Sequence, residues 1–194
     1  MTCENSGLPL DAALDEIASR LRTESTRLLL DHWRTVKGPL LMPDRRQIDP
    51  VQFAPVLPRV WLCDYAREAD RFRYRLTGER VAKRFGHNLS NHYLDDNTDP
   101  DYYPRVHRYY RNVIDFPAVL YIHGRLYAET DDPIHGERIL LPLSEDGQTG
   151  HGVIGATEEI IPRNKSDGRY LPEFQKHIYV TLETGAVVEE SLPV

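Results

Sequence analysis

The chain has 194 residues, with 24 Lys and Arg against 30 Asp and Glu, and a formal net charge of -6. This length suits one domain with extensions and is enough to bury a core. The acidic balance excludes nucleic acid as a general partner, and no apolar run approaches a membrane span. Cys3 and Cys63 build neither a disulfide framework nor a zinc pattern. With no visible signal peptide, we expect a cytoplasmic protein.

Residues 9–37 carry apolar side chains at helical spacing, and the pattern leaves open whether they form one helix or two. In the second part, Leu29, Trp33 and Val36 form an apolar stripe. Ser25 is a candidate N-cap because its hydroxyl can accept from a free backbone N–H. Several prolines then predict an irregular connection up to the first strand.

The segments LPRVWLCDY (57–65) and RFRYRL (71–76) predict two strands joined by a short turn, which makes a hairpin. In the second strand, aromatic and apolar residues alternate with arginines, so we expect one buried face and one solvent-facing basic side. Residues 78–85 then follow a helical pattern, and Thr77 is a candidate N-cap for that helix.

A longer helix is predicted over residues 104–114. Three strands are predicted after it, over 119–128, 137–144 and 151–161, with turn residues between them. The segment after residue 162 is polar at first, and its later part is expected to add a strand or to lie as an ordered arm.

Strands grouped in this way, without regular alternation with helices, predict an α+β fold. We expect a five-stranded antiparallel sheet with helices on one face, preceded by an N-terminal helical extension. The predicted division is 1–55 for the extension and the proline-rich link, 56–162 for the domain, and 163–194 for a C-terminal tail.

Three stretches of the chain resemble a bacterial PAS-like family, PAS type 5, whose members carry a Trp-containing helix, a proline-rich link and a first strand entered through Leu-Pro. They are HWRTVKGPLLMPDRRQIDP (32–50), LPRVWLCDY (57–65) and RFRYRLTGERVAKRFG (71–86), and the resemblance covers about residues 28–160. It implies a PAS-like domain that acts as a stand-alone sensory or regulatory module. Such a module binds a small molecule or a partner protein, signals in trans and has no chemistry of its own.

The resemblance implies a ligand site between the sheet and the helices, where a tyrosine hydroxyl would orient the bound molecule. A filled core, with each hydroxyl bonded to backbone, explains the same residues. His107 is added as a candidate because some PAS sensors ligate haem through a histidine on the corresponding helix. We nevertheless favour a histidine that is hydrogen-bonded locally, and we expect no cofactor. The candidate ligand-binding residues are Tyr74, Phe85, His107, Tyr109, Tyr110 and Ile122.

Other motifs argue against an enzyme. His87 and His92 lack zinc spacing, and there is no GxSxG, GxGxxG, phosphate loop or HExxH. We interpret Glu158 and Glu159 as a solvated surface, and we expect no catalytic residue and no metal. The alternative is an enzyme on a cone-shaped α+β scaffold, which would need an acid–base pair such as His107 with a carboxylate.

Two amphipathic stripes are candidates for an interaction surface. One is the outward set of positions on the strand at 119–128, and the other is the apolar stripe of the second N-terminal helical segment. Their residues are Leu29, Trp33, Val36, Tyr121, His123 and Tyr127. We expect a homodimer through the N-terminal helix or docking of a signalling protein. A dimeric scaffold without a ligand is the alternative to the sensor.

Overall fold

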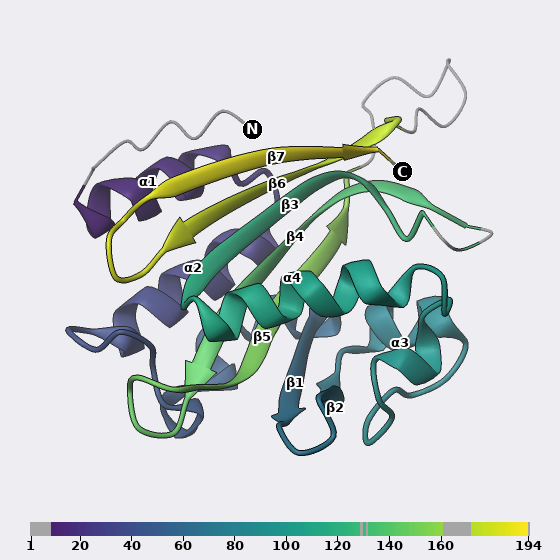
Figure 1. Ribbon diagram of the computed structural model, residues 1–194, viewed down its shortest axis with the longest axis horizontal. Coiled ribbons are helices and arrows are strands. Elements are labelled where there is room, and N and C mark those ends of the chain that lie inside the picture. Colours follow the sequence, from purple (N-terminus) through teal and green to yellow (C-terminus); the bar gives the residue numbers. More distant parts are fainter. Residues whose placement is uncertain (1–8, 129, 131, 161–171, 194) are drawn as a thin grey trace.

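The computed structural model describes residues 9–128, 130, 132–160 and 172–193. Its helices, with η for 3₁₀, are α1 (Leu10–Arg20), α2 (Glu24–Lys37), η1 (Arg45–Gln47), η2 (Pro50–Arg59), α3 (Glu79–Phe85), η3 (Asp95–Asn97) and α4 (Tyr103–Asp115). Its strands are β1 (Val60–Ala66), β2 (Arg71–Thr77), β3 (Ala118–Leu126), β4 (Ile134–Ser144), β5 (Gly150–Glu159), β6 (Phe174–Thr181) and β7 (Val187–Pro193). Within these residues, seven strands form one antiparallel sheet in the order β2-β1-β5-β4-β3-β6-β7 (Figure 1).

The α+β class and the antiparallel sheet are confirmed, but the expected five strands are wrong because the tail supplies two more. β6 pairs with β3 from Ala118↔Thr181 to Gly124↔Gln175, and β7 pairs with β6. The tail carries an apolar run, but its sequence does not show which strand offers a free edge. The division of the chain into extension, domain and tail stays a prediction.

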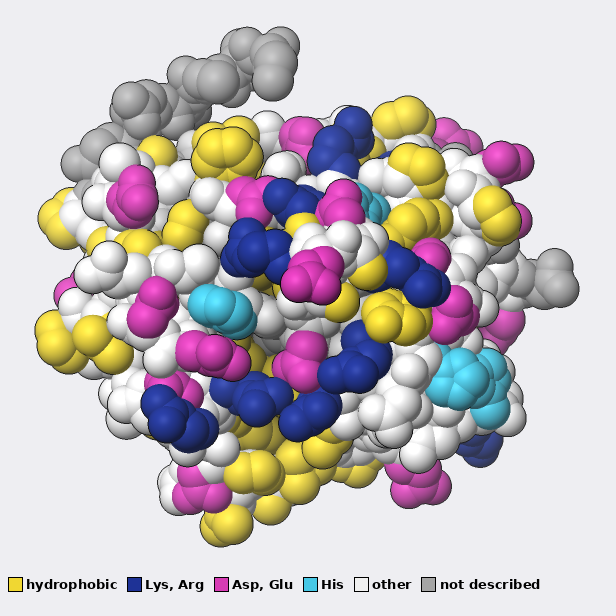
Figure 2. All heavy atoms as spheres, turned by 60° about the horizontal axis from the view of Figure 1, so that its bottom comes forward, with side chains coloured by type: hydrophobic (Ala, Val, Ile, Leu, Met, Phe, Trp, Pro, Cys, Tyr) yellow, Lys and Arg dark blue, Asp and Glu magenta, His cyan; other side chains and the backbone are white. Residues whose placement is uncertain are grey.

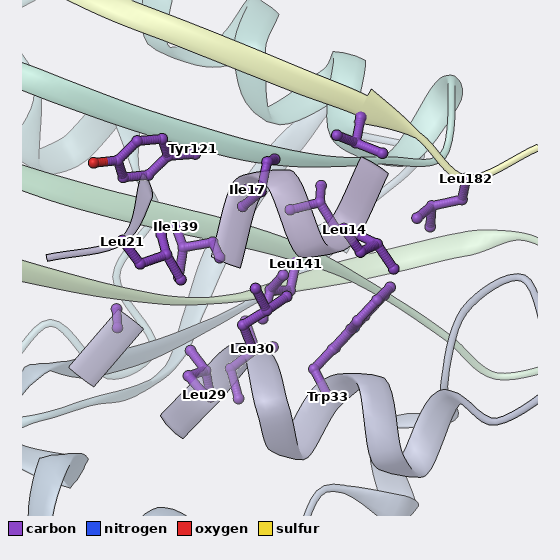
Figure 3. Packing of buried hydrophobic residues seen from close by; sticks show 14 of the residues in the cluster. Leu14, Ile17, Leu21, Leu29, Leu30, Trp33, Tyr121, Ile139, Leu141 and Leu182 are labelled. Atoms are coloured by element: carbon purple, nitrogen blue, oxygen red, sulfur yellow. The ribbon is translucent and has the colours of Figure 1, made fainter. Parts of the chain in front are cut away.

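The N-terminal segment forms two helices rather than one, and both cover the sheet face opposite to α4 (Figure 1). In Figure 3, Ile17 of α1 and Leu30 and Trp33 of α2 gather around Leu141 of the sheet. The indole N–H of Trp33 also donates to the carbonyl oxygen of Pro142 at 2.9 Å. The extension is therefore part of the hydrophobic core.

A buried glutamate of β4 joins this helix pair to the sheet. The carboxylate of Glu137 accepts the backbone N–H groups of Arg22 (3.0 Å) and Thr23 (2.7 Å) at the start of α2. It also accepts the hydroxyls of Thr23 (2.6 Å), Thr26 (2.7 Å) and Tyr121 (2.9 Å). The two N–H groups belong to the residues that lead into α2, and the Thr26 hydroxyl lies in its first turn, so a carboxylate at the positive end of the helix dipole fixes where α2 starts on the sheet.

Ser25, the expected N-cap, lies inside α2 instead, since the cap position is Thr23. The Ser25 hydroxyl donates to Glu158 of β5 at 2.6 Å, and Glu158 forms an ion pair with Arg59 at 2.6 Å. The interpretation of Glu158 as solvated surface is wrong, because α2 and η2 cover that end of the strand. Glu137 and Glu158 are direct partners across β4 and β5.

The arginine-rich hairpin strand β2 keeps its expected alternation only in part. Phe72 and Tyr74 are buried, but Leu76 is exposed near the end of this edge strand. The solvent side carries ion pairs, with Arg71 to Asp95 at 2.7 Å as the shortest. On the face shown in Figure 2, Lys and Arg side chains are interspersed with Asp and Glu rather than gathered in one patch.

The corner after β2 begins at Gly78 rather than at Thr77, which belongs to the strand. A Cβ on Gly78 would lie 2.2 Å from the carbonyl oxygen of Leu57, so only glycine allows this close approach. A second close approach involves Gly155 of β5, over which the indole of Trp61 lies. The Trp61 side chain thereby reaches Thr157, to which its N–H donates at 3.1 Å.

Replacing the buried carboxylate should loosen the helix pair. We expect Glu137→Gln to lower the free energy of unfolding by about 2–4 kcal/mol, because an amide NH₂ would face N–H and O–H donors. Urea denaturation measures the change. The control Glu183→Gln alters an exposed glutamate and should stay within about 0.5 kcal/mol of wild type. Equal stabilities of the two variants would contradict the role of Glu137.

Candidate functional site

A small cavity of about 30 Å³ lies between α4 and the sheet. Four of the six candidate ligand-binding residues line it: Tyr74, Phe85, Tyr109 and Tyr110. Ile122 belongs to the same buried cluster but does not line the cavity. The periods of α4 and β2 place these side chains on one face of each element. The packing of α4 on the sheet then brings together side chains from segments about 30 residues apart.

His107 lies outside the cavity, beside the turn between β1 and β2. Its Nε2 is 2.8 Å from the carbonyl oxygen of Asp70 and 3.2 Å from the Asp70 carboxylate. The imidazole also contacts the rings of Phe72 and Tyr103, with centroids 5.9 and 5.4 Å away. These contacts match the locally hydrogen-bonded histidine that we favoured from the sequence.

The volume limits what fits without rearrangement. About 30 Å³ has room for roughly two water molecules or one small ion. A larger ligand needs movement of the surrounding side chains. Burial raises the pKa of Tyr74 and Tyr110 well above the usual range, so these hydroxyls are neutral at physiological pH. The tyrosines therefore offer hydroxyl dipoles to the cavity and no charge.

Among the described residues that line the cavity, Arg138 of β4 alone is charged. Its Nε donates to the Thr157 hydroxyl at 3.0 Å, and its Nη1 donates to the Tyr109 hydroxyl at 3.1 Å. The guanidinium carbon lies 4.9 Å from the centroid of the Tyr127 ring, which is cation–π distance. Three side chains, those of Thr157, Tyr109 and Tyr127, thus contact Arg138 directly. Trp61 fixes the position of Thr157, because its indole N–H donates to the Thr157 hydroxyl.

Tyr127 was expected on the opposite face of the sheet, and the structure places it beside the cavity. β3 ends at Leu126, and Tyr127 takes a positive φ of 55°, so the strand alternation stops there. Its ring contacts Phe85 edge-on at 5.9 Å and the guanidinium of Arg84 at 4.4 Å.

The tail also contributes to the site through Gln175 and His177 of β6. Gln175 lines the cavity, and its side-chain oxygen lies 3.2 Å from Nε2 of the fully buried His177. Burial, together with the positive charges of Arg105 and Arg138, lowers the pKa of His177 to about 3. The His177 imidazole is therefore neutral, and it packs edge-on against the Tyr109 ring with centroids 5.4 Å apart.

The expected interaction surface is largely covered by the chain itself. Leu29, Trp33 and Tyr121 are buried between the N-terminal helices and the sheet, while Val36 and His123 are half-buried. In this conformation Leu29 and Trp33 contact the chain's own core. The homodimer through this helix stays a prediction, and it would have to use other residues of the helix.

Sequence reasoning missed Arg138, Gln175 and His177. One signal for Arg138 was present in the sequence, since Glu137 and Arg138 are adjacent and directly precede the apolar run ILLPL. Two adjacent charges in a buried strand point to opposite faces, and each needs its own partners. No comparable signal marked the tail, because its place in the sheet depends on pairing with β3.

The described part of the chain has neither a membrane-spanning helix nor a cluster of metal-ligating side chains. None of its helices is long and apolar enough to cross a membrane. Nor do three or more His, Cys, Asp or Glu side chains gather there in a way that would hold a metal ion. The thiol of Cys63 is buried, and burial raises its pKa well above the usual range.

An antiparallel sheet with helices on both faces, and with a small cavity between the sheet and α4, makes this an α+β domain of the kind expected from the sequence. The model of the PAS domain family matches residues 21–158, which is more than half of the chain. The chain therefore belongs to the PAS domain family, as the resemblance implied. No curated protein and no solved structure matches the chain.

The low pKa of His177 predicts an acid-sensitive fold. The unfolded state binds a proton as the pH falls below about 6.5, and the folded state does not until about 3, so stability is lost as the pH falls through this window. Between pH 6 and 5, we expect His177→Gln to reduce the slope of unfolding free energy against pH by about 1 kcal/mol per unit. Chemical denaturation at several pH values measures it.

The matched control is His87→Gln, which changes an exposed imidazole and should keep the slope of wild type. If both variants show the same slope as wild type, His177 does not control the acid sensitivity.

Proposed function

We propose that this PAS domain is a sensory or regulatory module that binds a small molecule in the cavity between α4 and the sheet. The observation that carries the proposal is the enclosure of one charged group, Arg138, among tyrosine hydroxyls in a cavity that is open to a small ligand. A core that only needed filling would use apolar side chains at that point.

The output of the module would pass through β4. Arg138 faces the cavity, while the preceding residue, Glu137, faces the start of α2 on the other side of the sheet. A ligand that moves β4 also moves the Glu137 carboxylate, which accepts the backbone N–H groups of Arg22 and Thr23. A shift in how the helix pair docks would then expose or cover a surface for a partner protein.

The proposal gives the chain a binding role and no reaction. His107 does lie 3.2 Å from a carboxylate, that of Asp70, as the enzyme alternative requires, but it lies outside the cavity, and its position there supports a binding role.

A second candidate is a protein-interaction module without a ligand. The small volume of the cavity favours it, because the interior is nearly filled by side chains. In that case the exposed apolar residues are the place to look for a partner, with Phe116 at the end of α4 among the most exposed.

The two candidates differ in what the purified protein carries. We expect freshly purified protein, denatured in organic solvent, to release a small molecule in a stoichiometric amount. Mass spectrometry and ion chromatography of the supernatant detect it. Val106→Leu adds bulk to the cavity and should abolish the release.

Val113→Leu is the control, since it makes the same change at a buried position of α4 that does not line the cavity. It should retain the molecule. If wild type releases nothing, the sensor is contradicted, and a dimer mass under native conditions would then support the interaction module.

A further inference from the structure

Among the described residues, no acidic side chain pairs with Arg138 to balance its charge. No carboxylate of the described residues lies within ion-pair distance of its guanidinium. Asp132 forms an ion pair with Arg84 at 3.6 Å, and the Glu190 carboxylate lies 3.5 Å from Nδ1 of the neutral His177, so neither is within ion-pair distance of Arg138. The contacts of Arg138 itself are hydroxyls and an aromatic ring.

One neighbouring group adds positive charge. Arg105 of α4 has buried Nε and Nη2 atoms without a hydrogen-bond partner, whereas Arg84, which contacts the same Tyr127 ring as Arg138, is paired with Asp132. The charges of Arg105 and Arg138 are both felt at His177, whose imidazole is neutral. Burial keeps Tyr74 and Tyr110 neutral, so the charge among the described residues that line the cavity is that of Arg138.

The guanidinium also retains free donors. An arginine side chain has five N–H groups, and the described residues accept two of those of Arg138, one from Nε and one from Nη1. The remaining three belong to Nη1 and Nη2, the two nitrogens whose parallel N–H groups fit both oxygens of a carboxylate. The residue is half-buried and lines the cavity, so these donors can meet a ligand there.

A half-buried guanidinium without a carboxylate partner among the described residues gives up part of its hydration and receives no opposite charge in return, whereas charges inside proteins are paired as a rule. We propose that the cavity binds a carboxylate, paired with Arg138, either as a free small anion or as the acidic end of a larger ligand. The assignment rests on the proposed function of the cavity and names its ligand class. The Tyr109 hydroxyl beside Nη1 is placed to assist in holding the anion.

Formate is the probe, because its three heavy atoms are of the size that about 30 Å³ accepts. Thermal unfolding is followed in chloride-free buffer, with ionic strength held constant by sodium HEPES, whose sulfonate is too large for the cavity. Formate should raise the Tm of wild type in a saturable way, by about 5 °C at 100 times its Kd. Formamide, the neutral analogue, should leave the Tm unchanged.

Two variants assign the effect to one residue. Arg138→Met removes the charge at similar length and should lose the formate shift entirely. Arg75→Met removes an exposed arginine from β2 and should keep the shift of wild type. If Arg138→Met does not fold, Arg138→Lys keeps the charge without the planar fork, and it should bind formate at least about tenfold more weakly.

A formate shift that survives in Arg138→Met, or an equal shift with formamide, would overturn the assignment. The failure of this inference can be told from the failure of the proposed function. A neutral molecule released from the purified protein would leave the sensor in place and overturn the carboxylate. No released molecule together with no formate shift would overturn both.

Discussion

The carboxylate of Glu137 determines how the two halves of this protein meet. A helix pair from the start of the chain covers a sheet formed mainly by its end, and apolar contact alone would allow the helices to slide. Glu137 removes that freedom because it accepts backbone N–H groups at one defined end of α2 and three hydroxyls around them. A charged group without water has to satisfy its lone pairs locally, and this requirement sets the position of α2 on β4.

The same strand supplies the charge on the other side of the sheet. Glu137 and Arg138 are consecutive, and a strand directs consecutive side chains to opposite faces. The helix anchor and the cavity are therefore separated by one peptide unit. An interaction at the cavity has the shortest possible route to the helix pair, which gives the proposed sensor a physical link between its input and its output.

The C-terminal strands belong to this arrangement as well. β6 extends the sheet on the edge of β3, and its two faces serve different parts of the molecule. Ile178 and Val180 pack under α1, whereas Gln175 and His177 stand at the cavity. The seventh strand then pairs with β6, so one edge of the sheet lies at β7 and the other at β2, which carries Tyr74.

The sequence alone located most of the elements that precede the tail and much of the cavity lining. Periods of two and of 3.6 are local properties, so they located β2 and α4 and showed which residues of each share a face, while the resemblance to the PAS-like family implied that Tyr74, Tyr109 and Tyr110 would face one space. The tertiary structure decided which charges are buried. The Glu137 carboxylate accepts the backbone N–H of Arg22 from 115 positions away in the chain, and the Arg138 guanidinium donates to the Tyr109 hydroxyl from 29 positions away. Such partners are invisible to a local pattern, because a buried charge is defined by what surrounds it in space.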